Sequence, residues 1–515
     1  MLFNSYEFIF LFLPIVLIGF FLIGGKGHHR IAISWLVAAS LFFYGWWNPA
    51  YLGLMLFSIL FNYGVGVFLC NVTNHNALKR YMLIIGVVVN LSVLGYFKYF
   101  NFFIENINNI ANTNINFQQV ILPLAISFFT FQQIAYLVDA FRGKTKEYNF
   151  LHYCLFVTFF PQLIAGPIVH HKEMLPQFAI DAVYKLNHKN IAIGLTIFIL
   201  GLFKKVVLAD GISVYSTAVF DAAEIGVLMT FFEAWGGALA YTFQLYFDFS
   251  GYSDMAVGIA IMFNIYLPFN FNSPYKATSI IDFWRRWHMT LSRFLKDYLY
   301  IPLGGSKKGK ARRYVNIMLT MVLGGLWHGA GWTFVFWGAL HGFYLILNHA
   351  WREIFGVKVK NKVGSFFAWV ATFFAVVFAW VPFRAETIDG AMNLLGSMVG
   401  LNGLSLPVSL SGKVGFAGGW LESMGVVFHG MFVNGVFGNR FSGVAWIVVL
   451  GFIATTFFNT QEIMLFKKTI KNSASGQNLK YIWRPTKVWA IFSVVLLILS
   501  ILNLSSVSEF LYFQF

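Results

Sequence analysis

Two histidines lie in sequence surroundings that suit proton-transfer chemistry. His328 is near the middle of an apolar stretch, within the run Gly324-Gly325-Leu326-Trp327-His328-Gly329-Ala330-Gly331. His288 precedes it by forty residues and ends the run Asp282-Phe283-Trp284-Arg285-Arg286-Trp287-His288. An imidazole has an ordinary pKa of about 6.5, so it exchanges protons near neutral pH. The two residues therefore indicate acid–base chemistry inside an apolar protein.

The position of His328 favours a functional role. An ionisable side chain at membrane depth is a functional-site hypothesis by default, and fifteen helical residues after Arg313 correspond to about 22 Å. The glycines around it predict close backbone approach, a bend, or room for a substrate. A histidine that only hydrogen-bonds between tightly packed helices is the competing interpretation, and the residues alone leave both open.

His288 follows alternating tryptophan and arginine, a pattern typical of a membrane–water boundary. Its functional interpretation is a polar entrance that receives an anionic, phosphorylated donor, with Arg285 and Arg286 attracting the phosphates. The alternative is an ordinary interfacial helix that binds lipid. These residues by themselves favour this alternative.

Other polar residues carry weaker signals. Asp248 and Asp254 adjoin an apolar span, where a structural ion pair is a better expectation than catalysis, and Arg142 is one candidate partner. His341 follows His328 by thirteen residues and is a lesser candidate for the same cavity. No HExxH zinc motif or phosphate-binding glycine loop occurs, so we predict no metal site.

The composition predicts an all-α, polytopic integral membrane protein. Of 515 residues, 58% are hydrophobic and only 11% are charged, with a mean hydropathy of +0.69. A soluble globular chain usually carries about a quarter charged residues. The few charged residues here cannot cover the water-facing surface of a chain of this length. The net charge of +16 indicates basic cytoplasmic loops and contacts with anionic lipid, and we expect no nucleic-acid binding.

Apolar runs of about 20 residues mark candidate membrane spans. They predict roughly ten to thirteen membrane helices, some short or re-entrant, and a single domain over residues 1–515. The candidate spans are 8–23, 33–47, 51–70, 81–97, 119–138, 151–169, 191–209, 228–247, 255–268, 315–348, 365–383, 443–459 and 487–504. The run 315–348 is long enough for a pair of helices.

Charge in the loops predicts orientation. Residues 276–313 carry ten Lys or Arg against two Asp, which places them in the cytoplasm by the positive-inside rule. The glycine-rich loop 384–442 is nearly balanced in charge, and we expect it on the opposite side.

Several motifs resemble the membrane-bound O-acyltransferase family, and the similarity is closest to the branch that contains bacterial alginate O-acetylase. They span nearly the whole chain in the family's order, with a motif core at about 120–350 followed by C-terminal helices. The matching motifs are Leu163-Ile164-Ala165-Gly166-Pro167, Leu245–Ala256, Phe283–His288, Asp297–Gly305, Gly325–Ala330 and the ending Phe510–Phe515.

The resemblance implies an O-acetyltransferase of the bacterial inner membrane. His328 matches the central catalytic residue and His288 a second motif position, both beside a central tunnel. The implied donor is acetyl-coenzyme A or another cytoplasmic acetyl carrier, with no permanently bound cofactor. The acetyl group then crosses the membrane to an exported polysaccharide, most simply alginate, with a periplasmic acetyltransferase and the export machinery as partners.

Other functions remain to be weighed against this one. Peptidoglycan or another cell-surface polysaccharide is an alternative acceptor, and D-alanyl transfer to teichoic acid is a further one. A proton-coupled transporter or flippase would use Asp248, Asp254 and His328 as a path, but we find no inverted repeat. A scaffold of an export complex gives no reason for two histidines in such matched surroundings.

Overall fold

The structure is a computed structural model of the 515-residue chain. It describes residues 1–515 except 73–75, 146–148, 357–360, 412, 414–416, 424, 433, 439, 465–481, 505–510 and 512–515. The predicted all-α class is confirmed, because the described residues form helices apart from one two-stranded parallel sheet of β1 (Leu404–Ser405) and β2 (Val426–Val427). The predicted ending Phe510–Phe515 lies almost wholly outside the described residues.

The chain forms two compact units, and neither is a continuous segment. Unit 1 comprises Met1–Phe203, Gly251–Asn270 and Thr460–Gln514, and unit 2 comprises Lys204–Ser250 and Phe271–Asn459. The single-domain prediction is not tested by this division.

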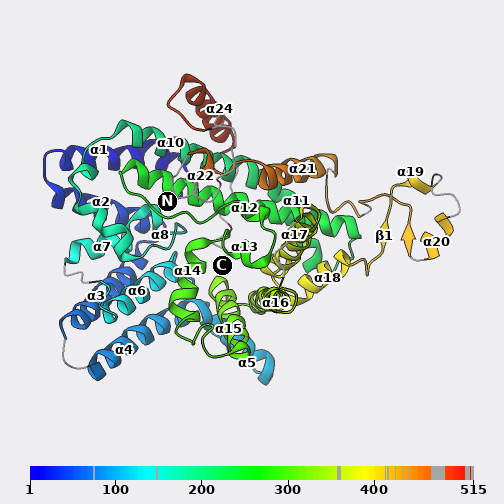
Figure 1. The fold of residues 1–515 in the computed structure, drawn as a ribbon, viewed down its shortest axis with the longest axis horizontal. Helices are drawn as coiled ribbons and strands as arrows, with labels where there is room; N and C mark the ends of the chain where they lie inside the picture. Colours follow the sequence, from blue (N-terminus) through cyan, green and yellow to red (C-terminus); the bar gives the residue numbers. More distant parts are fainter. Residues whose placement is uncertain are drawn as a thin grey trace. The chain divides into compact units, whose positions relative to one another are not determined.

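Unit 1 is built mainly from the N-terminal helices (Figure 1). Its helices are the π-helical η1 (Phe8–Phe12) and η2 (Gly95–Tyr99), α1 (Leu13–Gly24), α2 (His29–Gly45), α3 (Ala50–Asn71), α4 (Asn76–Leu94), α5 (Phe100–Ala111), α6 (Ile126–Phe141), α7 (Phe150–Thr158), α8 (Phe160–Leu163), α9 (His171–Met174), the 3-10 turns η3 (Leu175–Ala179) and η4 (Asp181–Tyr184), α10 (His188–Phe203), α22 (Thr460–Ile463) and α24 (Lys487–Asn503).

Unit 2 holds the central and later helices (Figure 1). They are η5 (Lys204–Ala209, π-helical), α11 (Asp210–Glu224), α12 (Phe231–Met262, which continues into unit 1), η6 (Pro274–Lys276), α13 (Ile280–Trp284), α14 (Met289–Leu295), η7 (Lys296–Tyr300, π-helical), α15 (Lys310–His328), α16 (Trp332–Phe355), α17 (Lys362–Arg384), α18 (Ile388–Met398), α19 (Val408–Ser411), α20 (Ala417–Ser423) and α21 (Arg440–Thr456).

The membrane helices agree only in part with the predicted spans. Four helical stretches in the described chain are long and apolar enough to cross a membrane: Ala50–Asn71, Asn76–Ala111, His188–Glu224 and Lys362–Arg384. Phe8–Gly24, Arg440–Thr456 and Lys487–Asn503 are shorter apolar helices. The count of ten to thirteen therefore stays a prediction.

Two boundaries in the predicted spans are wrong. The spans 228–247 and 255–268 lie largely within the single helix α12, which ends at Met262, because the polar residues between them do not interrupt the helix. The span 151–169 divides into α7 and α8 at Phe159, and Pro161 lies in the first turn of α8, where its ring fits although it would not fit a helix interior. Hydropathy depends only on the amino-acid composition of a segment, so it predicts neither the continuity of α12 nor the break between α7 and α8.

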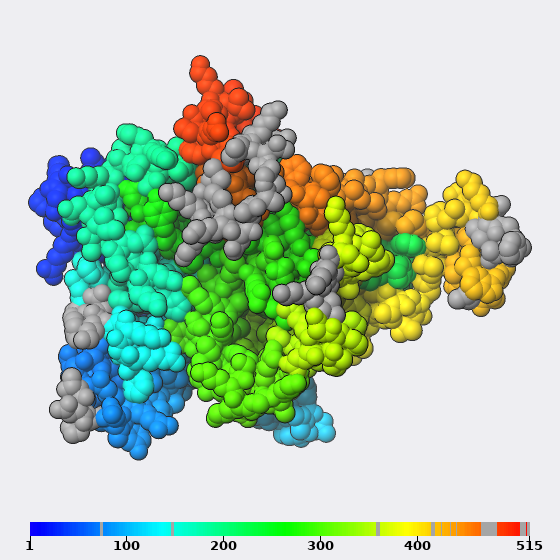
Figure 2. All heavy atoms as spheres, in the orientation of Figure 1, coloured from blue at the N-terminus to red at the C-terminus, as the bar shows by residue number. Residues whose placement is uncertain are grey.

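The segment 384–442 is also more structured than a loop. It contains α18, α19, α20 and the β1–β2 pair, and its described residues are coloured yellow to orange in Figure 2. Glu224 tethers the start of this segment, because its carboxylate accepts hydrogen bonds from the backbone N–H of Glu386 at 2.7 Å and the hydroxyl of Thr387 at 2.6 Å.

Candidate active site

His328 is the last residue of α15, and the chain after it is extended. Gly329 and Gly331 adopt extended backbone, and α16 starts at the next residue, so the stretch 315–348 is the predicted pair of helices. A Cβ at Gly325 would overlap the carbonyl oxygen of Phe334, and one at Gly338 would overlap that of Met321. Small residues thus let α15 and α16 touch backbone to backbone.

Aromatic rings surround the His328 side chain, which is buried. Its ring centroid lies 4.9 Å from that of Trp327, 5.3 Å from Trp337 on α16, and 5.2 Å from Phe383 on α17. The imidazole is therefore held in one orientation by three helices of unit 2.

His288 lies beside His328, although forty residues separate them in the chain. The two ring centroids are 6.5 Å apart. Phe249 of α12 packs edge-on against His288 at 4.8 Å. The sequence placed each histidine in a motif, and the fold brings both motifs to one position.

The backbone of His288 is strained. It caps α14 with φ +39° and ψ 54°, in the left-handed region that residues other than glycine rarely adopt. Such conformations cost about 1–3 kcal/mol and persist where surrounding packing enforces them, often at functional sites. Burial lowers the pKa of His288, in this segment between α13 and α14, to about 3, because the charged imidazole loses its hydration. His288 is therefore neutral at physiological pH.

The arginine pair has no demonstrated ligand role. The Nε of Arg286 donates to Asp282 Oδ2 at 3.0 Å, and its Nη1 donates to the Asn272 carbonyl oxygen at 3.3 Å. Arg285 is exposed. That either residue attracts donor phosphates stays a prediction.

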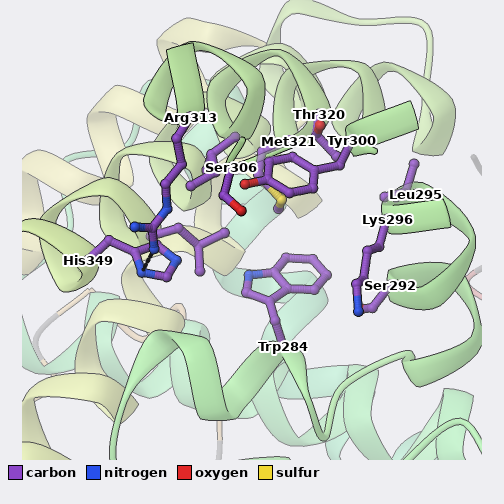
Figure 3. Close-up of a pocket in the computed structure, with 12 residues that line it drawn as sticks. Trp284, Ser292, Leu295, Lys296, Tyr300, Ser306, Arg313, Thr320, Met321 and His349 are labelled. Atoms are coloured by element: carbon purple, nitrogen blue, oxygen red, sulfur yellow. Dashed lines mark hydrogen bonds between the residues drawn. The ribbon is translucent and has the colours of Figure 1, made fainter. Parts of the chain in front are cut away.

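A cavity of about 450 Å³ lies within unit 2, and Trp284 and Ser292, four residues before and after His288 in the chain, line it (Figure 3). Its rim carries the exposed Lys296 and Ser306, and its deeper wall is formed by buried side chains of α14 and α15. Arg313 donates to Glu353 at 2.9 Å and also to Nδ1 of His349. The lining residues are Trp284, Ser292, Leu295, Lys296, Tyr300, Ser306, Arg313, Ile317, Thr320, Met321, Leu345 and His349.

A buried cluster of charges lies near the start of α11, and two of its members, Lys205 and Asp210, were not singled out in the sequence. The ammonium of Lys205 is 2.7 Å from Asp210 and 2.8 Å from Asp248. The ion pair expected for Asp248 is thus confirmed, with Lys205 as its partner. The signal was a lysine inside the predicted span 191–209, where an ionisable group calls for an explanation. Asp254 accepts a hydrogen bond from the Thr460 hydroxyl at 2.6 Å.

Metal ligation has no candidate in the part of the chain that the structure describes. No three His, Cys, Asp or Glu residues there are grouped to hold an ion. The chemistry available from these side chains is proton transfer by buried imidazoles, and the cavity of the same unit carries cationic residues.

Comparison with known proteins identifies the family. The profile of the membrane-bound O-acyltransferase family matches residues 140–383, a segment that contains His288 and His328. The peptidoglycan O-acetyltransferase of Helicobacter pylori is 49% identical over 432 residues, which cover 79% of this chain and 81% of that protein. The chain belongs to the membrane-bound O-acyltransferase family.

Membership makes the chain a membrane-bound enzyme that transfers acyl groups. Among other O-acyltransferases, the probable alginate O-acetylase of Pseudomonas aeruginosa is 42% identical, covering 77% of this chain and 75% of that protein. The teichoic acid D-alanyltransferase of Streptococcus thermophilus is 29% identical over 45% of this chain and 58% of that protein. The resemblance predicted from the motifs is confirmed.

Proposed function

We propose that this acyltransferase takes an acetyl group from a cytoplasmic donor, acetyl-coenzyme A or a similar thioester, and passes it across the inner membrane for O-acetylation of an exported polysaccharide. The observation that carries the proposal is the pair of buried histidine rings, 6.5 Å apart, within the segment that matches the family. The names of the two most similar relatives reported above, both O-acetylating enzymes, supply the acyl group and the acceptor class.

His328 acts as the general base in this proposal. Its neutral imidazole takes the proton of an acceptor hydroxyl as the oxygen attacks the thioester carbonyl carbon. The C–O bond forms, the C–S bond breaks, and the imidazolium returns the proton to the thiolate that leaves. A positioned base contributes about 10²–10⁴-fold to such a rate. His288, in ring contact with His328, orients the reacting groups.

The cavity supports entry of the donor from the basic side of the protein. Lys296 and Arg313 bring positive charge to it, and they belong to the segment 276–313 that the positive-inside rule assigns to the cytoplasm. Phosphates of an anionic donor are attracted to such a site. The orientation and the crossing of the membrane are parts of the proposal.

The names of the relatives support two acceptor polymers equally. Alginate is the acceptor in the name of the relative at 42% identity, and peptidoglycan in that of the relative at 49%. A D-alanyl acceptor is less favoured, because that relative matches a smaller part of this chain. A periplasmic acetyltransferase and the polysaccharide export machinery complete the proposed route.

Transfer of radiolabelled acetyl from acetyl-coenzyme A in isolated membranes tests the proposal. Wild-type membranes are expected to label polysaccharide, and His328→Ala is expected to lower the rate by at least about 10²-fold while the protein still inserts. Analysis of ester-linked acetate on peptidoglycan and on alginate from the same cells distinguishes the acceptors. Full activity of His328→Ala would overturn the role of His328, and solute transport without covalent labelling would favour a transporter.

A further inference from the structure

Trp284 joins the cavity to a buried histidine that the reaction does not use. Its indole lies between the side carrying Arg313 and His349 and the side carrying Lys296 and Ser292 (Figure 3). The indole N–H donates a hydrogen bond to Nδ1 of His341 at 3.3 Å. One wall of the cavity is thus fixed from behind by α16.

His341 is completely buried among aromatic rings. Its ring lies parallel to Phe283, at 9° and 6.1 Å between centroids, and 5.0 Å from Trp337. Within the described part of the chain, the bond from Trp284 is its one hydrogen bond. Because Nδ1 accepts, the ring proton is on Nε2. A buried imidazole is costly unless it is hydrogen-bonded. The bond from Trp284 satisfies Nδ1, while Nε2 has no hydrogen-bond partner in the described residues.

Trp284 also connects the cavity wall to His328 through one further indole. Its ring contacts Trp337 at 5.9 Å, and Trp337 contacts His328 at 5.3 Å. Met321 lines the cavity and precedes His328 by seven residues on α15, which corresponds to about 10 Å along the helix. We take the route of an acyl group from the cavity to His328 to run past these indoles.

Leu295 narrows the same region from the other side. It lines the cavity, and a Cβ at Gly324 would lie 3.1 Å from its Cδ1. The side chain thus covers the glycine face of α15 one turn before His328.

We propose that Trp284 is a specificity-determining residue that restricts transfer to a short acyl group, and that His341 is the positioning residue that holds it in place. The inference rests on the proposed acetyl transfer. A fixed indole admits a two-carbon acyl group along the path toward His328 and obstructs longer ones. Releasing or shrinking the indole removes that obstruction.

The test compares transfer from acetyl- and butyryl-coenzyme A in membranes containing the full-length enzyme. The readout is the ratio of kcat/KM for butyryl to that for acetyl, in which the amount of folded enzyme cancels. Trp284→Ala is expected to raise the ratio at least tenfold. Trp284→Phe and His341→Phe each remove the hydrogen bond and keep a ring, and each is expected to raise the ratio about fivefold, the effect of one neutral hydrogen bond.

Conservative and control variants separate positioning from general packing. His341→Gln retains an acceptor and is expected to keep the ratio within about twofold of wild type. The double variant of Trp284→Phe and His341→Phe is expected to show no further rise, because both remove the same bond. Trp351→Phe, at a tryptophan that is 56% exposed on the same helix, is the matched control and leaves the ratio unchanged.

Failure of the specificity inference can be distinguished from failure of the proposed acetyl transfer. Wild-type enzyme that transfers acetyl, combined with unchanged ratios in Trp284→Ala and His341→Phe, would overturn this inference and leave the proposed function standing. Wild-type membranes that transfer neither acyl group would overturn the proposed function, and this inference with it. If His341→Phe does not fold, Trp284→Phe still decides the result.

Discussion

Removing the charge of Lys205 is expected to destabilise the protein strongly. The lysine side chain is 2% exposed and contacts Asp248, which is 1% exposed, and Asp210, which is 15% exposed. Breaking a buried ion pair by deleting one partner costs about 3–5 kcal/mol, because the remaining charge is left uncompensated. Lys205→Met leaves two such carboxylates close together, so we expect the upper part of this range.

Variants of the aspartates give a graded comparison. Asp248→Asn leaves Lys205 paired with Asp210, so the expected loss is smaller, about 1.5–3 kcal/mol, the contribution of a hydrogen bond to a charged group. The triple variant of Lys205→Met, Asp210→Asn and Asp248→Asn removes all three charges. It is expected to be more stable than Lys205→Met alone, since no unpaired charge stays buried.

Thermal unfolding of the detergent-purified protein, followed by tryptophan fluorescence, measures the order of stability. The expected order of Tm is wild type, then Asp248→Asn, then Lys205→Met, with the triple variant above Lys205→Met. Lys189→Met, at an exposed lysine, is the control and should not shift Tm. The reasoning is refuted if Lys205→Met unfolds at the wild-type temperature, or if the triple variant is less stable than the single one.

Three further predictions concern other parts of the protein. Gly325→Ala should abolish acyl transfer in correctly inserted protein, because its Cβ would force α15 away from α16. Gly331→Ala is the control and should stay active, because the nearest atoms are 3.6 Å from an added Cβ. Equal activities of the two variants would contradict this reasoning. The folded-state pKa of His288 lies below the unfolded value of about 6.5, so its contribution to stability is present above pH 6.5 and is lost toward pH 3, by up to about 1.4 kcal/mol per unit. His288→Gln should flatten the dependence of Tm on pH between 7 and 5, and an unchanged slope would count against it. The side-chain amides of Asn62 on α3 and Asn90 on α4 donate hydrogen bonds to each other, at 3.1 and 2.6 Å. Asn62→Ala should lower the free energy of unfolding by about 0.6–1.7 kcal/mol. The double variant with Asn90→Ala should lose less stability than the two single variants lose together.

Hydropathy and motif spacing predicted the class of this protein for a physical reason. Long apolar helices have to satisfy their backbone within the lipid, so a membrane fold leaves a signal in every span. That signal located α3, α17 and the α15–α16 pair well. It failed at α12, where a polar segment stays helical, and at α7–α8, where a new helix with a proline in its first turn begins inside an apolar run. The composition of a segment does not show where a helix continues and where it ends.

The sequence by itself determined that the protein is helical and membrane-bound, and it singled out His288 and His328 through the motifs around them. Only the tertiary structure decided that the two rings lie together, that Lys205 neutralises Asp248, and that His341 holds Trp284 beside the cavity. Periodicity and hydropathy report which residues share a face of one helix. Contacts between residues far apart in the chain depend on how several helices pack, and here glycines and aromatic rings set that packing.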